Sequence, residues 1–205
     1  MIESSRHWAA LACAALAVVA LLRPRASLAQ DDCPTAQTAK SGFVVERNEQ
    51  QKSEVSRDDK GVIHTVMRYN GTTLLETAQF EGIFSLERLD RGRRTTYEPS
   101  EDLKNLFPLK PGQQAHAKFI TEHDGQYGRL YVELDVKGTE DLAVGPCKYS
   151  VLRIDRREST SAVPPQFVYA ELYSPDLKLI LAREYKRQNG EAQVIKYDRI
   201  YPLKK

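Results

Sequence analysis

The sequence has 205 residues and a formal net charge of only +2, with 28 acidic against 30 basic side chains. A general nucleic-acid-binding surface needs a clear basic excess, so this balance argues against nucleic acid as a partner. The chain is long enough for one domain that buries its own core.

The N-terminal segment has the pattern of an export signal. Arg6 gives it a positive start, and an uncharged apolar run follows from Trp8 to Leu22. Ser27 and Ala29 place small side chains where signal peptidase requires them, so residues 1–29 are predicted to be a signal peptide that is cleaved after Ala29. The apolar run is shorter than a bilayer-spanning helix, which disfavours a permanent membrane anchor.

The cysteines follow from this interpretation. Lipidation of Cys13 is the alternative processing event, but the residues before it match a lipoprotein box poorly, so Cys13 is interpreted as part of the apolar run. Cys33 and Cys147 remain after cleavage, and export into an oxidising compartment makes their pairing in a disulfide the default. Residues 30–205 are therefore predicted to be one β-rich domain, nearly neutral in charge, in the periplasm or secreted.

Strand patterns begin at Phe43. The first group of predicted strands, separated by turn residues, is Phe43–Arg47, Val62–Tyr69, Thr72–Phe80 and Ile83–Leu89. Asn70-Gly71 between two of them is a strong hairpin signal, and Gly82 is expected at a bulge or tight corner. Arg91–Arg94 is interpreted as a solvated turn.

One short helix is predicted at Ser100–Phe107. Ser100 can cap its N-terminus, and Pro108 ends it. Turn signals then divide the remaining chain, with a loop at 138–146 and a polar stretch at 158–165. The second group of predicted strands is Ala115–Glu122, Tyr127–Lys137, Cys147–Arg157, Phe167–Tyr173, Lys178–Tyr185 and Ala192–Tyr201.

The clearest alternation lies between Gly128 and Lys137. Leu130, Val132, Leu134 and Val136 share one face, and the residues between them are polar or amphipathic. Because side chains alternate across a strand, this segment has one dry and one wet face. The pattern predicts a mainly β protein built on a twisted antiparallel sheet.

Two motifs in the second half carry a family resemblance: Leu106-Phe-Pro-Leu-Lys-Pro-Gly112 and Glu171-Leu-Tyr-Ser-Pro-Asp-Leu177. With them the chain resembles a loose group of uncharacterised exported bacterial β-rich proteins that share an FPLKxG segment and a YSPxL turn. The resemblance implies a curved antiparallel sheet, half-barrel or barrel-like, similar to the periplasmic lipoprotein carriers LolA and LolB. Those carriers hold acyl chains in their concavity, so it also implies a lipid or another amphiphile as partner.

The extent of the dry face raises the question of what covers it. A helix of eight residues is only about 12 Å long, which is narrower than several strands at nearly 5 Å each. Either the first strand group packs across the rest, or a groove stays open for an amphiphile. The closed arrangement is favoured, because Phe43, Val45, Val62 and Val66 also need to be buried.

Candidate ligand-binding residues come from the tyrosines, whose broad ring and polar tip suit a glycan, peptide or amphiphile. They are equally favoured for cross-strand packing. Leu134 is a further candidate if a groove is open. Five tyrosines lie mainly in the polar phase of predicted strands: Tyr127, Tyr131, Tyr149, Tyr169 and Tyr173.

No catalytic or metal-binding motif is found in the sequence, so no cofactor is expected. Glu133 and Asp135 share a strand face, so this carboxylate pair could serve as the catalytic residues of a hydrolase. The first hypothesis is thus a non-enzymatic binding or envelope-associated protein with a ligand in its curved sheet. The alternatives are a structural partner that docks another envelope protein by a sheet edge, or a carboxylate-dependent hydrolase.

Overall fold

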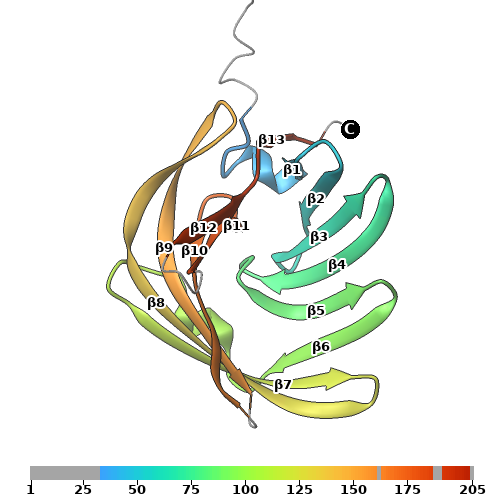
Figure 1. The fold of residues 1–205 in the computed structure, drawn as a ribbon, viewed down its shortest axis with the longest axis vertical. Coiled ribbons are helices and arrows are strands. Elements are labelled where there is room, and N and C mark those ends of the chain that lie inside the picture. Colours follow the sequence, from blue (N-terminus) through green and yellow to red (C-terminus); the bar gives the residue numbers. More distant parts are fainter. Residues whose placement is uncertain (1–32, 161–162, 187–190, 204–205) are drawn as a thin grey trace, which may run out of the picture.

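The computed structural model describes residues 33–160, 163–186 and 191–203. The predicted signal peptide, its cleavage site and Cys13 lie outside these residues. The described chain forms one sheet of thirteen strands, each antiparallel to its neighbours, in the order β12-β11-β10-β9-β8-β7-β6-β5-β4-β3-β2-β1-β13 (Figure 1). The mainly β, curved antiparallel fold predicted from the sequence is confirmed.

Most strands follow one another as a meander. The first six are β1 (Phe43–Arg47), β2 (Gln51–Arg57), β3 (Val62–Tyr69), β4 (Thr72–Phe80), β5 (Phe84–Asp90) and β6 (Arg93–Pro99). The others are β7 (Gln114–His123), β8 (Gln126–Val144), β9 (Cys147–Thr160), β10 (Val163–Ser174), β11 (Leu179–Lys186), β12 (Ala192–Lys196) and β13 (Arg199–Pro202). Two 3-10 helices complete the described chain: η2 (Thr38–Ser41) and η3 (Leu103–Leu106).

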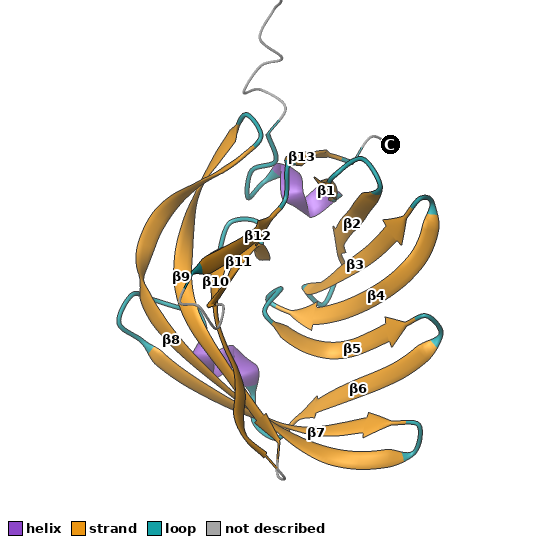
Figure 2. Ribbon diagram, in the orientation of Figure 1, coloured by secondary structure: helices purple, strands orange, loops and turns teal. Residues whose placement is uncertain are grey.

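The sheet curls on itself without closing. β12 forms one edge, whereas β13, the next strand in sequence, pairs with β1 at the other edge. Two residues carry the chain between these edges: the N–H of Tyr197 donates to Leu181 O at 3.4 Å, and the N–H of Asp198 donates to Glu46 O at 2.7 Å. The long strands β8 and β9 therefore face β3–β6 across the interior (Figure 2).

The predicted turns are confirmed in the first strand group. Asn70 and Gly71 have φ of 48° and 80°, which is the left-handed pair that a two-residue hairpin requires. Gly82 has φ of 69°, and the corner between β4 and β5 enters the interior of the curled sheet there. A Cβ on Gly82 would lie 1.6 Å from the carbonyl oxygen of Lys178, so only glycine fits this close approach.

The predicted helix at Ser100–Phe107 is a single 3-10 turn, η3. The N–H of Ser100 still bonds the sheet through Lys118 O at 2.8 Å, so Ser100 is not the cap. Asp102 takes that role, and its carboxylate accepts a bond from the N–H of Lys104 at 3.0 Å. The few residues left before Pro108 cannot offset the cost of nucleating an α-helix.

Long-range pairing extends several strands, so the predicted loop 138–146 was wrong. β8 runs through it to Val144: after an irregularity at Gly138 its polar residues pair with β9. The turn predicted at Arg91–Arg94 is confirmed at Arg91 and Gly92, and Arg93 begins β6. In the polar stretch 158–165, β9 continues to Thr160 and β10 begins at Val163.

The predicted last strand, Ala192–Tyr201, is also wrong as one element. It divides into β12 and β13, which pair with different neighbours at opposite edges of the sheet. The local sequence gives no sign of this division, because each half keeps an extended backbone.

Two apolar cores fill parts of the interior. The first, which we call the η3 core, lies beneath η3 and the β4–β5 corner and includes Phe84, Leu103, Leu134, Val136 and Ile154. The second, which we call the η2 core, brings β1 against β9–β11 and includes Phe43, Val45, Val151 and Leu181. Phe43 and Val45 are thus buried against the second strand group, whereas Val62 and Val66 are only partly buried.

The predicted disulfide is present: Cys33 and Cys147 are bonded, with their Cα atoms 5.6 Å apart. Cys147 begins β9 and belongs to the η2 core. The bond therefore fastens the lead-in before η2 to the second strand group, across 114 residues of sequence.

Candidate ligand cavity

Between the two cores the curled sheet encloses a cavity of about 670 Å³. Its wall is formed by strands from both sides of the sheet and by the β4–β5 corner. Arg183 and Arg88, two arginines of this wall, have side chains that are 44% and 47% exposed, so the cavity is open to solvent. A cavity of this size can hold a small organic ligand.

Much of the wall is hydroxyl-bearing. Thr65, Thr77, Arg88 and Thr95 are successive cross-strand partners on β3, β4, β5 and β6, so they form one row across the sheet. All four line the cavity. Thr65 Oγ1 is buried and bonds no other described residue. Thr95 Oγ1 is 2.9 Å from His123 Nδ1, and Arg88 bonds Asp90, so the Thr65 hydroxyl is the buried group of this row that the described residues leave without a partner.

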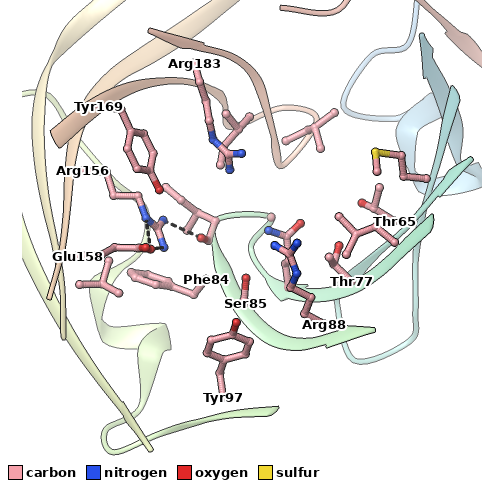
Figure 3. Close-up of a pocket in the computed structure, with 18 of the residues that line it drawn as sticks. Thr65, Thr77, Phe84, Ser85, Arg88, Tyr97, Arg156, Glu158, Tyr169 and Arg183 are labelled. Carbon is pink, nitrogen blue, oxygen red and sulfur yellow. Dashed lines mark hydrogen bonds and ion pairs between the residues drawn. The ribbon is translucent and has the colours of Figure 1, made fainter. Parts of the chain in front are cut away.

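Arg156 anchors the opposite wall. It is buried, and its Nη1 donates to the carbonyl oxygen of Ile83 at 3.0 Å, which ties β9 to the β4–β5 corner. It also bonds Glu158 at 2.7 Å (Figure 3). Its Nη1 lies 3.4 Å from Glu171. Burial lowers the pKa of Arg156, but the two carboxylates outweigh that effect and raise it above its ordinary value.

A second arginine shares the buried carboxylate. Nε of Arg183 lies 3.0 Å from Glu171 Oε1, and the guanidinium carbon lies 5.7 Å from the centre of the Tyr169 ring. Burial raises the pKa of Tyr169, so its hydroxyl stays protonated at neutral pH. Figure 3 shows Arg183, Tyr169 and Arg88 pointing into the same space from different strands.

Three other cations line the cavity: Arg47, Arg129 and Lys196. None forms an ion pair with a carboxylate among the described residues. Together with Arg88, Arg156 and Arg183 they make six cationic side chains, against one lining carboxylate, Glu158. Arg88, Arg156 and Arg183 pair with Asp90, Glu158 and Glu171, so the excess of positive charge in the wall comes mainly from Arg47, Arg129 and Lys196.

Part of the remaining wall is apolar. Phe84, Phe119, Leu130 and Val132 extend the η3 core to the cavity surface, and Ile180 continues it on β11. Polar and apolar groups thus face the same space, as in sites for ligands that combine both characters.

The predicted binding residues are placed differently from one another, and only Tyr169 lines the cavity. Tyr149 is in the η2 core, where burial raises its pKa to about 12, and Tyr173 and Leu134 are in the η3 core. Tyr127 is 79% exposed and Tyr131 is half-buried.

The carboxylates considered for hydrolysis do not reach the cavity. Glu133 and Asp135 lie on the face of β8 opposite Leu134, and Glu133 Oε2 lies 4.0 Å from the outward Arg157. Asp135 pairs with Lys137. Within the described residues, no group of three or more His, Cys, Asp or Glu side chains is placed to hold a metal ion. No helix in that part of the chain is long and apolar enough to cross a membrane.

Sequence reasoning missed Arg156 and Arg183, although a signal was present. Leu152 and Ile154 share the inward face of β9, and Arg156 is the next residue in that phase. Leu179 and Leu181 precede Arg183 on β11 in the same way. A charged residue that continues an apolar phase indicates a buried ion pair or a polar cavity, and both are found here.

Comparison with known proteins adds little to this description. No family model and no curated protein matches the chain. A similar solved structure is the crystal structure of the hypothetical lipoprotein YmcC from Escherichia coli (K12), with a TM-score of 0.47 and 12% sequence identity. The matched region covers 84% of this chain and 92% of that one.

Proposed function

We propose that this is an exported binding protein of the cell envelope that holds a partly polar, partly apolar ligand inside its curved sheet, without chemical turnover. The observation that carries the proposal is the 670 Å³ cavity between the two apolar cores. In both cores the innermost side chains, such as Leu134 and Val45, are at most 1% exposed, so the open volume is a local feature of the fold.

The character of the wall supports a ligand with polar groups. A buried hydroxyl is costly unless a partner satisfies it, and the Thr65 hydroxyl in this wall has no partner among the described residues. The apolar patch around Phe84 and Leu130 suits the other part of an amphiphile. A purely aliphatic ligand would leave the Thr65 hydroxyl and the Nη groups of Arg183 without partners in the described part of the chain.

Export is supported by the predicted signal peptide and by the disulfide between Cys33 and Cys147. Disulfides persist in oxidising compartments such as the periplasm and are rare in the cytosol. The lipoprotein-carrier-like function implied by the sequence motifs is compatible with such a compartment.

Docking to another envelope protein stays a prediction beside the binding function. Its structural basis is β12, an edge strand that pairs with β11 on one side and with no other described strand. Val194 in this strand is 52% exposed. Unpaired edge strands are templates for pairing with a second chain.

Native mass spectrometry of protein purified from the periplasm tests the binding function. The wild-type chain is expected to carry a non-covalent small molecule. Thr77→Trp places a large ring into the cavity and is expected to remove that molecule. Glu76→Trp adds the same ring on the opposite, exposed face of β4 and is expected to leave it bound.

Both variants should keep the circular dichroism spectrum of the wild type. Equal occupancy in Thr77→Trp and Glu76→Trp, or no bound molecule in the wild type, would contradict the binding function.

A further inference from the structure

We infer that the cavity contains a subsite for an oxyanion, formed by the Arg183 guanidinium and Arg88, and that the ligand carries a phosphate, sulfate or carboxylate group on a partly apolar body. This inference rests on the proposed function, because it names the chemical class of the ligand that the cavity takes.

The positive charge of the wall is the first argument. Six cationic side chains and one carboxylate face a single cavity. Like charges around a shared, partly desolvated space repel one another, and an anionic ligand would relieve this repulsion. A wall needed only to complete the fold would be more stable with aliphatic residues in these positions.

The contacts of each cation show whether the fold already satisfies it or leaves it available to a ligand. Arg156 is satisfied by the fold, since its guanidinium bonds Glu158, Glu171 and the carbonyl oxygen of Ile83. It is a structural residue. Arg183 differs, because among the described residues it bonds only through Nε to Glu171. Its Nη groups bond no other described residue, and 44% of its side chain is exposed.

Arg183 is also held in place. Glu171 is fully buried, and its Oε1 accepts the bond from Arg183 Nε, while the ring of Tyr169 lies beside the guanidinium. A planar guanidinium fixed through one edge presents its remaining N–H groups in the fork that matches an oxyanion. Less side-chain entropy is then lost when a ligand binds.

Arg88 completes the subsite from the opposite wall. It extends from β5 into the space toward which Arg183 points (Figure 3). Its Nη2 bonds the half-exposed Asp90 at 2.7 Å. Its cross-strand neighbour Thr77 adds a hydroxyl on the same row, whereas the Thr95 hydroxyl is bonded to His123 Nδ1 at 2.9 Å. The adjoining patch of Phe84 and Leu130 would receive the apolar body of the ligand.

Two fluorescent probes test this subsite on the full mature protein. Anilinonaphthalene sulfonate carries an oxyanion on an aromatic body, and phenylnaphthylamine is the same body without the sulfonate. Titration of both probes into the natively folded protein should show the sulfonate bound at least roughly tenfold more tightly. Inorganic phosphate, sulfate and acetate, added as competitors, should then rank the three oxyanions as sources of the recognised group.

Arginine variants test which side chains cause the difference in affinity between the two probes. Arg183→Gln is expected to weaken the sulfonate probe by roughly ten- to a hundredfold, as the loss of a charge-assisted bidentate bond predicts, and to leave the neutral probe unchanged. Arg183→Lys should recover only part of the affinity, because lysine keeps the charge without the fork. Arg157→Gln removes an arginine from the outer face of β9 and should change neither probe.

Arg88→Gln provides a second variant, since Arg183→Gln removes a partner of the buried Glu171 and can affect folding. Its own partner, Asp90, is half-exposed, so the fold should be retained and the sulfonate probe weakened. If both probes bind equally and respond to Thr77→Trp but to neither arginine variant, the oxyanion subsite is overturned while the binding function stands. If neither probe binds, or neither responds to Thr77→Trp, both the subsite and the binding function are overturned.

Discussion

Strands β8 and β4 lie on opposite sides of the interior, and their inward faces are made of different residues. On β8, Val132, Leu134 and Val136 alternate with polar residues and are at most 1% exposed. On β4, the inward side chains Thr77 and Gln79 are only partly buried and line the cavity, and the strand has no regular apolar alternation. Apolar inward residues therefore mark the packed part of the interior, whereas polar inward residues mark the part that is left open.

The β4–β5 corner makes the boundary between these two regions. Ile83 is buried in the η3 core, and its carbonyl oxygen accepts the bond from Arg156. The Tyr173 hydroxyl donates to Glu81 O at 2.8 Å, and Lys178 bonds the Glu81 carboxylate at 2.5 Å. The corner thus fastens β4 and β5 to β9–β11 and separates packed core from open cavity.

The largest expected effect comes from breaking this boundary with Gly82→Val. The new Cβ would overlap the backbone carbonyl of Lys178, and the positive φ adds strain. We expect a loss on the order of 5 kcal/mol in the free energy of unfolding, measured by urea denaturation. Gly71→Ala is the control: it also has a positive φ but nothing within 4 Å, so a loss of only roughly 1–2 kcal/mol is expected.

A packed and an open inward face should also respond differently to truncation. Leu134→Ala removes a side chain that is 1% exposed, so the resulting cavity should lower the free energy of unfolding by roughly 2–5 kcal/mol. Thr77→Ala on the open wall should cost less than about 1 kcal/mol. If Leu134→Ala instead melted like the wild type but bound a fluorescent fatty acid more weakly, Leu134 would line a ligand groove. The inward face of β8 would then not be a packed face.

A third prediction concerns a buried polar group that the fold satisfies completely. Glu46 is 2% exposed and accepts bonds from Tyr201 at 2.6 Å and Arg199 at 2.9 Å, with Lys52 at 2.9 Å. Burial raises its pKa, but these three partners outweigh it and lower the pKa to about 2.

Because the folded pKa of Glu46 is depressed, its contribution is present above the unfolded value near 4.5 and is lost as pH falls toward 2. We expect roughly 2–3 kcal/mol of stability to disappear in that window, measured by denaturation at stepped pH. Glu46→Gln should be less stable at neutral pH and should show a flatter acid limb. An unchanged acid limb in this variant would mean that other carboxylates cause the acid sensitivity.

The smallest expected effects distinguish satisfied from unsatisfied hydroxyls. The Tyr149 hydroxyl is buried in the η2 core and bonds no described residue, so Tyr149→Phe should be neutral or stabilising by up to about 1 kcal/mol. Tyr173→Phe removes the bond to Glu81 O and should cost about 1 kcal/mol. In thermal melting, Tyr173→Phe should lower the melting temperature and Tyr149→Phe should not; two equal losses would show that the Tyr149 hydroxyl has a partner.

Local patterns in the sequence were enough for several features of the fold. The alternation of Leu130, Val132, Leu134 and Val136 correctly identified the buried face of β8, and Asn70-Gly71 correctly identified a hairpin. The pairing of Cys33 with Cys147 followed from composition and export. Each of these depends on neighbouring residues or on the compartment, so no knowledge of distant strands was needed.

The cavity could not be predicted in this way. Arg156 bonds the carbonyl of Ile83, which is 73 residues away, and Arg183 depends on Glu171 from the adjacent strand. Gly82 is needed because the backbone of Lys178 approaches it, and the segment Ala192–Tyr201 divides because its halves pair with strands at opposite edges. Only the tertiary structure decides these features. A buried charge is tolerated where distant groups satisfy its hydrogen bonds, and a small residue is required where a distant backbone approaches, and the curled sheet determines which groups those are.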